Sequence, residues 1–473
     1  MEGLEEANKA TTSKTSSTNR PLIIFLVVVF GQGSWIALNG LWVQLPLLVS
    51  LGIPEQFQIA TWLVLVIQVA NIGPLIFTLV NYFTPSGFHF EIATNYFITA
   101  LGAIVTFLLI FLWDKQSVWG FTQSDNLHST ALILCAFFLS VVDCTSSVAF
   151  TPFMSRFKPY YVTWYFVGEG VSSLTPSIVA LIQGVGGKAD CVANETSIVE
   201  NATHVQECTS WVPVQKSARF GPSGFFGFLF VMSFACFLSY LLLNILPQAR
   251  SEQSKQSVKN GQKSNNYEMV SSSDVNHNDS DETLKQRIRP FQSLVLLFTI
   301  LGVVSALNNS VLPSVQSYSA GAYGIPTYLL AATLACVTKP IASMLVLVRP
   351  KDNIGVVVAV GLVGVCAGCY SMMTALTSPF PPLQHTTIGR FLIVTAWITS
   401  SGCFSYVHAT VGWILRQETQ NRVLFIWFGG ITQLGSLIGA CTMFVIVNKT
   451  DILQPYYEDP CENAVPCEIS TLP

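Results

Sequence analysis

The chain has 473 residues, of which 51% are hydrophobic and only 10% are charged, whereas soluble domains carry roughly 25% charged residues. The formal net charge is −3, which is too small to indicate binding to nucleic acid or to a strongly charged partner. Apolar runs of about 20 residues, long enough to cross a bilayer, recur along most of the sequence. The composition excludes a soluble globular protein and predicts an all-α, polytopic membrane protein.

The first twenty residues are polar and carry Lys9, Lys14 and Arg20. This pattern resembles the start of a signal peptide, but the apolar run that follows has no A-x-A site and continues past any plausible cleavage point. We therefore expect residues 1–20 to be a cytoplasmic tail and the run after them to be a retained first span.

The first span changes character along its length. Residues 21–30 are almost all apolar, but residues 31–46 carry amides, tryptophans and glycines. A helix that only anchored the chain would stay apolar, because each unsatisfied polar group in hydrocarbon costs several kcal/mol. Helical periodicity aligns Ser34, Leu38 and Trp42, with Trp35 and Asn39 beside them. This stripe predicts a helix that faces a wet, substrate-sized cavity.

Eleven spans follow from the apolar runs, in a 6 + 5 arrangement. The expected ranges are 22–43, 58–80, 91–113, 129–152, 160–184, 222–246, 291–313, 323–347, 353–376, 388–415 and 423–447. Residues 247–290, between the sixth and seventh spans, are rich in Ser, Asn, Asp, Lys and Gln, which predicts a disordered cytoplasmic linker.

An odd number of spans places the two termini on opposite sides of the membrane. With the N-terminus inside, the cytoplasmic segments hold 16 lysines and arginines and the outer segments hold six. This asymmetry follows the positive-inside rule. We therefore expect a cytoplasmic N-terminus and an extracellular C-terminal tail, residues 448–473.

Residues 185–221 form the long outer loop in this orientation. The loop contains two glycosylation sequons, at Asn194 and Asn201, as expected for an exterior segment. Of the twelve cysteines, four lie outside the spans, and an oxidising compartment favours disulfides among them. The local pairings are Cys191 with Cys208 and Cys461 with Cys467; other pairings stay open.

The seventh span repeats features of the first. The sequence Ala-Leu-Asn at 37–39 recurs at 306–308, and each copy is followed by Leu-Pro. A second polar stripe contains Ser305, Asn308, Asn309, Leu312 and Gln316. Many carriers are built from repeated halves with the substrate at their interface, so both stripes are predicted to line one cavity. The alternative is that these polar groups only bond neighbouring helices.

Other spans also carry polar groups. The second span has Gln68 and Asn71 one turn apart. Ionisable groups are costly inside a membrane and are therefore candidates for coupling or function; those placed deepest are Asp143, Glu169, Lys339 and His408. Asp143 or Glu169 could instead pair with Arg156 or Lys158, and His408 could simply be hydrogen-bonded. No catalytic set, metal site or phosphate loop is present in the sequence, so no enzyme activity, metal or cofactor is expected.

The candidate lining consists of amides, hydroxyls and aromatic rings with few charges. Amides bond an imide or a polyol, and indole and phenyl faces stack on flat rings. This chemistry favours a nucleobase, a flavin or a sugar over an amino acid or an inorganic ion.

Several strings resemble the vertebrate riboflavin transporters. They include GQGSW and NGLWVQLPLLV in residues 31–49, IQVANIGPL at 67–75, VDCTSS at 142–147, FVGEG at 166–170 and LPSVQSYS at 312–319. The resemblance implies a major-facilitator-like, nucleoside-transporter-like fold and riboflavin uptake across the plasma membrane without sodium, in some members favoured by external acid. It also implies substrate contacts at Ser34, Leu38, Trp42, Phe166, Asn308 and Asn309.

We therefore expect a riboflavin uptake carrier that works by alternating access. In this hypothesis Trp42 and Phe166 stack the isoalloxazine ring, while amides including Asn39, Gln68 and Asn71 bond its polar edges. One alternative keeps the carrier and changes the cargo to a nucleoside or another flat neutral solute. Another, from a different class, is a multispan receptor or viral entry protein.

Overall fold

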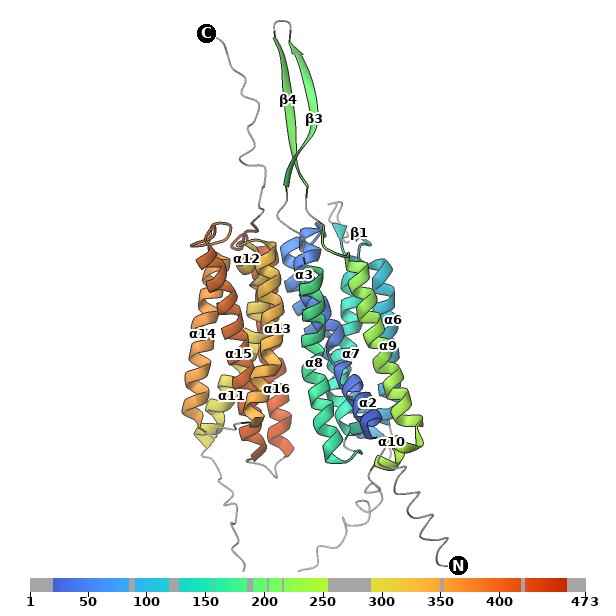
Figure 1. Cartoon of the computed structure of the whole chain (residues 1–473). Helices are drawn as coiled ribbons and strands as arrows, with labels where there is room; N and C mark the ends of the chain where they lie inside the picture. The colour runs from blue at the N-terminus through green and yellow to red at the C-terminus, as the bar shows by residue number, and fades with distance from the viewer. Residues whose placement is uncertain are drawn as a thin grey trace, which may run out of the picture.

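The computed structural model describes residues 20–84, 90–118, 127–154, 156–184, 190–201, 204–214, 217–253, 291–348, 353–417 and 422–456. Within these ranges the chain is mostly helical, and two bundles of helices stand side by side (Figure 1). A long hairpin, β3–β4, projects from one end of the molecule, and the short helix α10 lies at the other. We refer to these as the hairpin end and the α10 end.

The first bundle, coloured blue to green in Figure 1, forms the N-terminal half. Its helices are α2 (Arg20–Gln32), α3 (Ile36–Ser50), the 3-10 turn η1 (Gln56–Gln58), α4 (Ile59–Ala70), α5 (Ile72–Phe83), α6 (Phe90–Leu112), α7 (Thr130–Met154), α8 (Pro159–Gln183), α9 (Pro222–Ile245) and α10 (Pro247–Glu252). A small sheet joins β1 (Ser117–Val118) to β2 (Leu127–His128) at the hairpin end.

The second bundle, coloured yellow to red, forms the C-terminal half. Its helices are α11 (Phe291–Ala306), the π-helical turn η3 (Leu307–Val311), α12 (Leu312–Gly321), α13 (Ile325–Val348), α14 (Ile354–Leu376), α15 (Thr387–Gln417) and α16 (Arg422–Lys449). The seventh span therefore continues past Pro313, its expected end, to Gly321, and the first continues past Val43 through Pro46 to Ser50. The expected ends at Val43 and Pro313 were therefore too early, and Pro46 and Pro313 are each accommodated within a continuing span.

Among the described residues, nine helices are long and apolar enough to cross a membrane, or ten when α2 and α3 count as one broken span. The expected eleventh is α15, which is not among them although it packs lengthwise between α13 and α14. The polytopic and nearly all-helical fold is thus confirmed, while the count of eleven spans stays a prediction.

The first and seventh spans are both interrupted within the bundle. The axis bends by 53° between α2 and α3, and a π-helical turn separates α11 from α12. In each half, the helix before the break packs on the fifth span of that half through glycine. A Cβ on Gly31 of α2 would lie 2.3 Å from the carbonyl oxygen of Tyr165 in α8. A Cβ on Gly435 of α16 would lie 2.4 Å from the carbonyl oxygen of Gly302 in α11. These close approaches require glycine and support the interpretation of two repeated halves.

The apolar core joins the halves only toward the hairpin end. One cluster combines residues of α3, α4 and η1, such as Leu48 and Phe57, with residues of the C-terminal half, such as Tyr318. A second cluster belongs to the N-terminal half alone and includes the stacked rings of Phe30 and Tyr240, 5.2 Å apart. The halves are therefore packed together at one end of the bundle and more separate at the other.

The hairpin pairs β3 (Asp190–Asn201) with β4 (His204–Val214) and carries both predicted glycosylation asparagines on β3. Its register places Cys191 opposite Pro213 and Cys208 opposite Ser197. The two cysteines are thus offset by six residues along the hairpin, or about 20 Å, which is too far for a disulfide. This register does not favour the local Cys191–Cys208 pairing, which stays a prediction.

Several other predictions fall on residues outside the described ranges. They are the N-terminal tail up to residue 19, most of the linker at 254–290, and the C-terminal segment with Cys461 and Cys467.

Candidate functional site

A cavity of about 450 Å³ lies between the two halves, which is within the usual size range for small-molecule sites. Its wall is drawn from α3, α4, α5 and α7 on one side and from α11, η3, α12, α13, α15 and α16 on the other. The polar and aromatic part of the wall consists of Trp35, Asn39, Trp42, Gln68, Asn71, Ser147, Ser305, Asn308, Asn309, Lys339, Ser343, Ser405, His408, Thr432, Gln433 and Ser436.

The break in the first span places α3 against this cavity. A helix that starts in the middle of a bundle leaves its first backbone N–H groups without partners. Here the amide of Leu38 donates to Asp143 Oδ2 of α7 over 3.0 Å, and the Ser34 carbonyl accepts from the Ser146 hydroxyl over 2.9 Å. A carboxylate at a helix N-terminus is also favoured by the helix dipole. Asp143 thus fixes the start of the helix that carries Asn39 and Trp42.

The π-helical turn η3 places residues of the seventh span against the same cavity. Such turns widen the helix and occur often at functional sites. The side-chain amide of Asn308 donates to Asn309 Oδ1 over 3.1 Å, and that of Asn309 donates to Ser436 Oγ of α16 over 3.1 Å. The turn therefore presents two adjacent amides to the cavity, held by α16.

Trp42 connects the two stripes directly. Its indole Nε1–H donates to Gln316 Oε1 of α12 over 3.1 Å, across the interface between the halves. Because the indole nitrogen is held in this way, the ring has a fixed orientation at the cavity wall. Trp35, at the N-terminal cap of α3, adds a second indole.

The hairpin end of the cavity is closed by contacts between the halves. The Thr61 hydroxyl of α4 donates to the Ser314 carbonyl over 3.2 Å, and the Ser317 hydroxyl of α12 donates to the Phe57 carbonyl over 2.6 Å. The rings of Phe57 and Tyr318 lie 5.8 Å apart. All residues of α12 from Ser314 to Gly321 are buried. We call this group of contacts the hairpin-end gate.

The α10 end is much less closed. Within α5, Phe77 is the one buried residue, and this helix packs mainly on α7 while α11 packs mainly on α16 and α15. Asn71 donates to Gln433 Oε1 over 2.9 Å in an exposed bond between the halves. The cavity is thus closed at the hairpin end and lies nearer to solvent at the α10 end.

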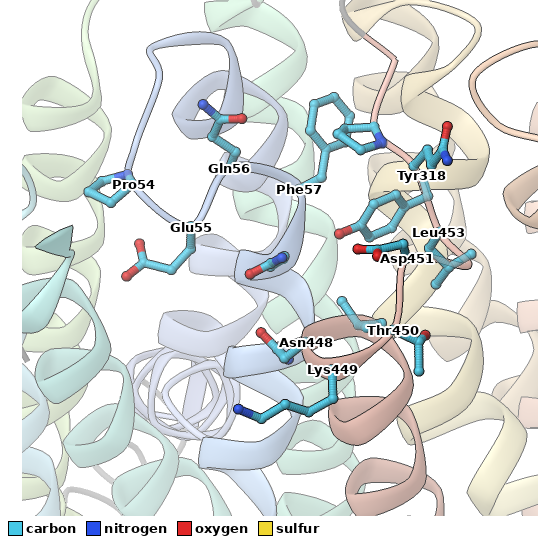
Figure 2. A pocket seen from close by; sticks show the side chains of 14 residues that line it. Pro54, Glu55, Gln56, Phe57, Tyr318, Asn448, Lys449, Thr450, Asp451 and Leu453 are labelled. Carbon is cyan, nitrogen blue, oxygen red and sulfur yellow. The ribbon is translucent and has the colours of Figure 1, made fainter. Parts of the chain in front are cut away.

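A second pocket, of about 610 Å³, lies beyond the gate at the hairpin end. Figure 2 shows its wall, which includes Phe57, Tyr318, Lys449 and Asp451. Glu55 is also part of this wall, but its carboxylate contacts residues outside the pocket. Its Oε1 accepts from the Ser129 amide over 2.8 Å and lies 3.1 Å from His128 Nδ1. Although this pocket is larger, it lies at the end of the bundle. The central cavity combines both polar stripes at mid-depth and is the stronger candidate.

Most of the predicted substrate contacts lie on the wall of the central cavity: Leu38, Asn39, Trp42, Gln68, Asn71, Asn308 and Asn309. Gln316 lies beside it, in a small side pocket of about 20 Å³. Two predicted contacts do not line either space. Ser34 is fully buried and donates to its own backbone, the Gly31 carbonyl, over 2.8 Å. Phe166 is 47% exposed and packs on Tyr165.

The four predicted intramembrane charges separate into two groups. Lys339 and His408 lie on the cavity wall, with His408 Nε2 3.4 Å from the Thr432 hydroxyl. Asp143 and Glu169 lie off it. The suggested pairing of these acids with Arg156 or Lys158 is wrong, because Arg156 pairs with Glu91 and Lys158 lies 2.7 Å from Glu252.

Several residues of the wall were not predicted as site residues. They are Ser147, Ser343, Ser405 and the polar face of α16 formed by Thr432, Gln433 and Ser436. The α16 face could have been found, because these three residues are spaced i, i+1, i+4 in an otherwise apolar span. Isolated serines give no such signal.

Comparisons with known proteins agree with this architecture. The family described as "Solute carrier family 52, riboflavin transporter" matches residues 19–455. Riboflavin transporter member 3-B from Danio rerio is 39% identical, over 93% of this chain and 98% of the relative. Member 3 from Homo sapiens is 37% identical, over 90% and 96%. Among solved structures, a point mutant of the nucleoside transporter NupG covers 91% of this chain and 94% of its own, with a TM-score of 0.51 and 10% identity. The last likeness shows the fold alone, which this chain shares with that nucleoside transporter.

Proposed function

This chain belongs to solute carrier family 52, the riboflavin transporters, and we propose that it takes up riboflavin across the plasma membrane by alternating access. The observation that carries the proposal is the central cavity, which brings the amide and indole stripes of α3 and η3 together between two halves. Closure at the hairpin end supports an inward-facing state. Uptake then requires that the gate open and the α10 end close, so that the cavity is exposed to one side at a time.

The proposed orientation places the hairpin end outside the cell. The two sequons on β3 are at this end and would be glycosylated there. The excess of lysine and arginine in the segments at the opposite end favours the same orientation.

The chemistry of the wall suits the flat, neutral isoalloxazine ring and its polyol chain. In the proposed pose, the ring stacks on Trp42, and the amides of Asn39, Asn308 and Asn309 bond the imide edge or the ribityl hydroxyls. Phe166 is not part of this pose because it lies off the cavity wall. Trp35 takes its place as the second aromatic group.

Sodium-independent transport is part of the proposal. The described wall of the cavity contains no aspartate or glutamate, so it offers no anionic oxygen ligand for a hard cation. A response to external acid is also proposed.

Uptake of radiolabelled riboflavin by cells that express the chain tests the proposal. Trp42→Ala should lower uptake by about fivefold to 150-fold, since stacking on an aromatic side chain contributes about 1–3 kcal/mol. Trp427→Ala is the matched control, because Trp427 is 59% exposed and lies off the cavity wall. It should leave uptake unchanged. Normal uptake by Trp42→Ala, at equal surface abundance, would refute the assignment.

A further inference from the structure

Lys339 of α13 is the one lysine on the described wall of the central cavity, and neither aspartate nor glutamate accompanies it there. The same lysine also lines the small side pocket, together with Trp42, Asn308 and Gln316. Within the described part of the chain its ammonium group has no hydrogen-bond or ion-pair partner. The two acids at similar depth do not serve as partners. Asp143 is fully buried and accepts from the Leu38 amide, and Glu169, although the adjacent Gly170 packs against Pro340, forms no ion pair with Lys339 within the described residues.

A charge at this depth in a membrane is costly unless it is solvated or paired. In the present state, water can reach Lys339 because the cavity lies near solvent at the α10 end and the residue is only half-buried. Alternating access requires a state in which the cavity is closed on both sides around its cargo. Water is then largely excluded, and the ammonium group needs a counter-charge that the described wall does not supply. The cargo can supply it.

We propose that the central cavity binds flavins that carry a negative charge, such as riboflavin 5′-phosphate, with Lys339 as the group that holds the anion. The inference rests on the proposed function and extends its substrate class from neutral to anionic flavins. The position of Lys339 fits this role because it shares the side pocket with Trp42. A flavin stacked on that indole has the lysine within reach of its substituents. The hydroxyls of Ser343 and Ser405 on the same wall offer further donors to a phosphate.

Binding to the purified full chain tests the inference, with quenching of flavin fluorescence as the readout. Riboflavin and riboflavin 5′-phosphate are titrated against the wild type, Lys339→Gln and Lys339→Arg. Lys339→Gln should lower the affinity for riboflavin 5′-phosphate about tenfold more than the affinity for riboflavin. This is the effect expected for the loss of one charge-assisted hydrogen bond. Lys339→Arg should restore most of the difference, because it keeps the charge.

The matched control is Lys449→Gln, which removes a lysine from the pocket beyond the gate. It should leave the ratio of the two affinities unchanged. The inference is overturned if that ratio is the same in the wild type and Lys339→Gln, or if Lys449→Gln is the variant that changes it. Riboflavin binding by each variant reports whether it is folded. If the phosphate binds through Lys339 but cells take up no riboflavin, the proposed uptake function fails and the inference stands.

Discussion

Gly321, the last residue of α12, gives the most specific test of the hairpin-end gate. A Cβ at this position would lie 2.8 Å from Phe57 Cε1 and 3.6 Å from Cδ1. Phe57 has little room to move, since it is 4% exposed, its carbonyl accepts from Ser317, and its ring contacts Tyr318. Overpacking of this kind costs about 1–3 kcal/mol. Because the contact joins the two halves, we expect the cost to fall on the closed gate and to be relieved when the halves separate there.

Gly321→Ala should therefore shift the population toward the state that is open at the hairpin end, by about fivefold to 150-fold. The assay uses Val64→Cys, a buried position on the cavity wall, and a membrane-impermeant thiol reagent applied to intact cells. Labelling of this cysteine should be faster in Gly321→Ala than in the parent. The chain without Val64→Cys gives the background from native cysteines.

Gly227→Ala in α9 is the matched control. Both substitutions add one methyl group to a helical residue, but a Cβ on Gly227 meets no atom within 4 Å. Equal labelling rates in the two variants, at equal surface abundance, would show that the Phe57–Gly321 contact does not hold the gate closed.

Three further predictions concern the frame around the cavity. Asp143→Ala should lower riboflavin uptake about tenfold, because the buried Leu38 amide then lacks its acceptor at a cost of about 1–3 kcal/mol; unchanged uptake would show that Asp143 does not position α3. Gly435→Ala should sharply reduce the amount of folded protein in size-exclusion chromatography, because its Cβ would lie 2.4 Å from the Gly302 carbonyl oxygen. Gly430→Ala on the same helix is the control: its Cβ would meet no atom within 4 Å, so this variant should behave as wild type. Gln44→Leu should raise the midpoint of thermal unfolding in detergent, because both amide atoms of this buried side chain lack partners in the described part of the chain; a lower midpoint would contradict this.

The sequence was sufficient to place much of the cavity. Polar side chains are costly in a span, so the stripes that contain Asn39, Trp42, Asn308 and Asn309 could be predicted to face a shared space, and all four lie on its wall. Their role as substrate contacts stays a proposal.

The prediction failed where it assumed one continuous helix. The break at residues 33–35 changes the direction of the first span. Ser34 lies within the break and its hydroxyl donates to the Gly31 carbonyl, while Leu38 and Trp42 lie after it. Periodicity cannot be carried across such a break.

Asp143 shows a different limit. The sequence marks it as a costly buried charge, but its partner is the backbone amide of Leu38, 105 residues earlier. No side-chain pattern reports an unpaired backbone group, because that group exists only once α3 has been broken from α2. Phe166 was named from the family resemblance, and it is 47% exposed and lies off the cavity wall.

A structure of the chain with saturating riboflavin would test the central claim most directly. We expect the isoalloxazine ring between α3 and η3, stacked on Trp42 and within hydrogen-bond distance of Asn308 or Asn309. Riboflavin bound in the pocket beyond the gate, beside Phe57 and Tyr318, with the central cavity empty of it, would contradict the account.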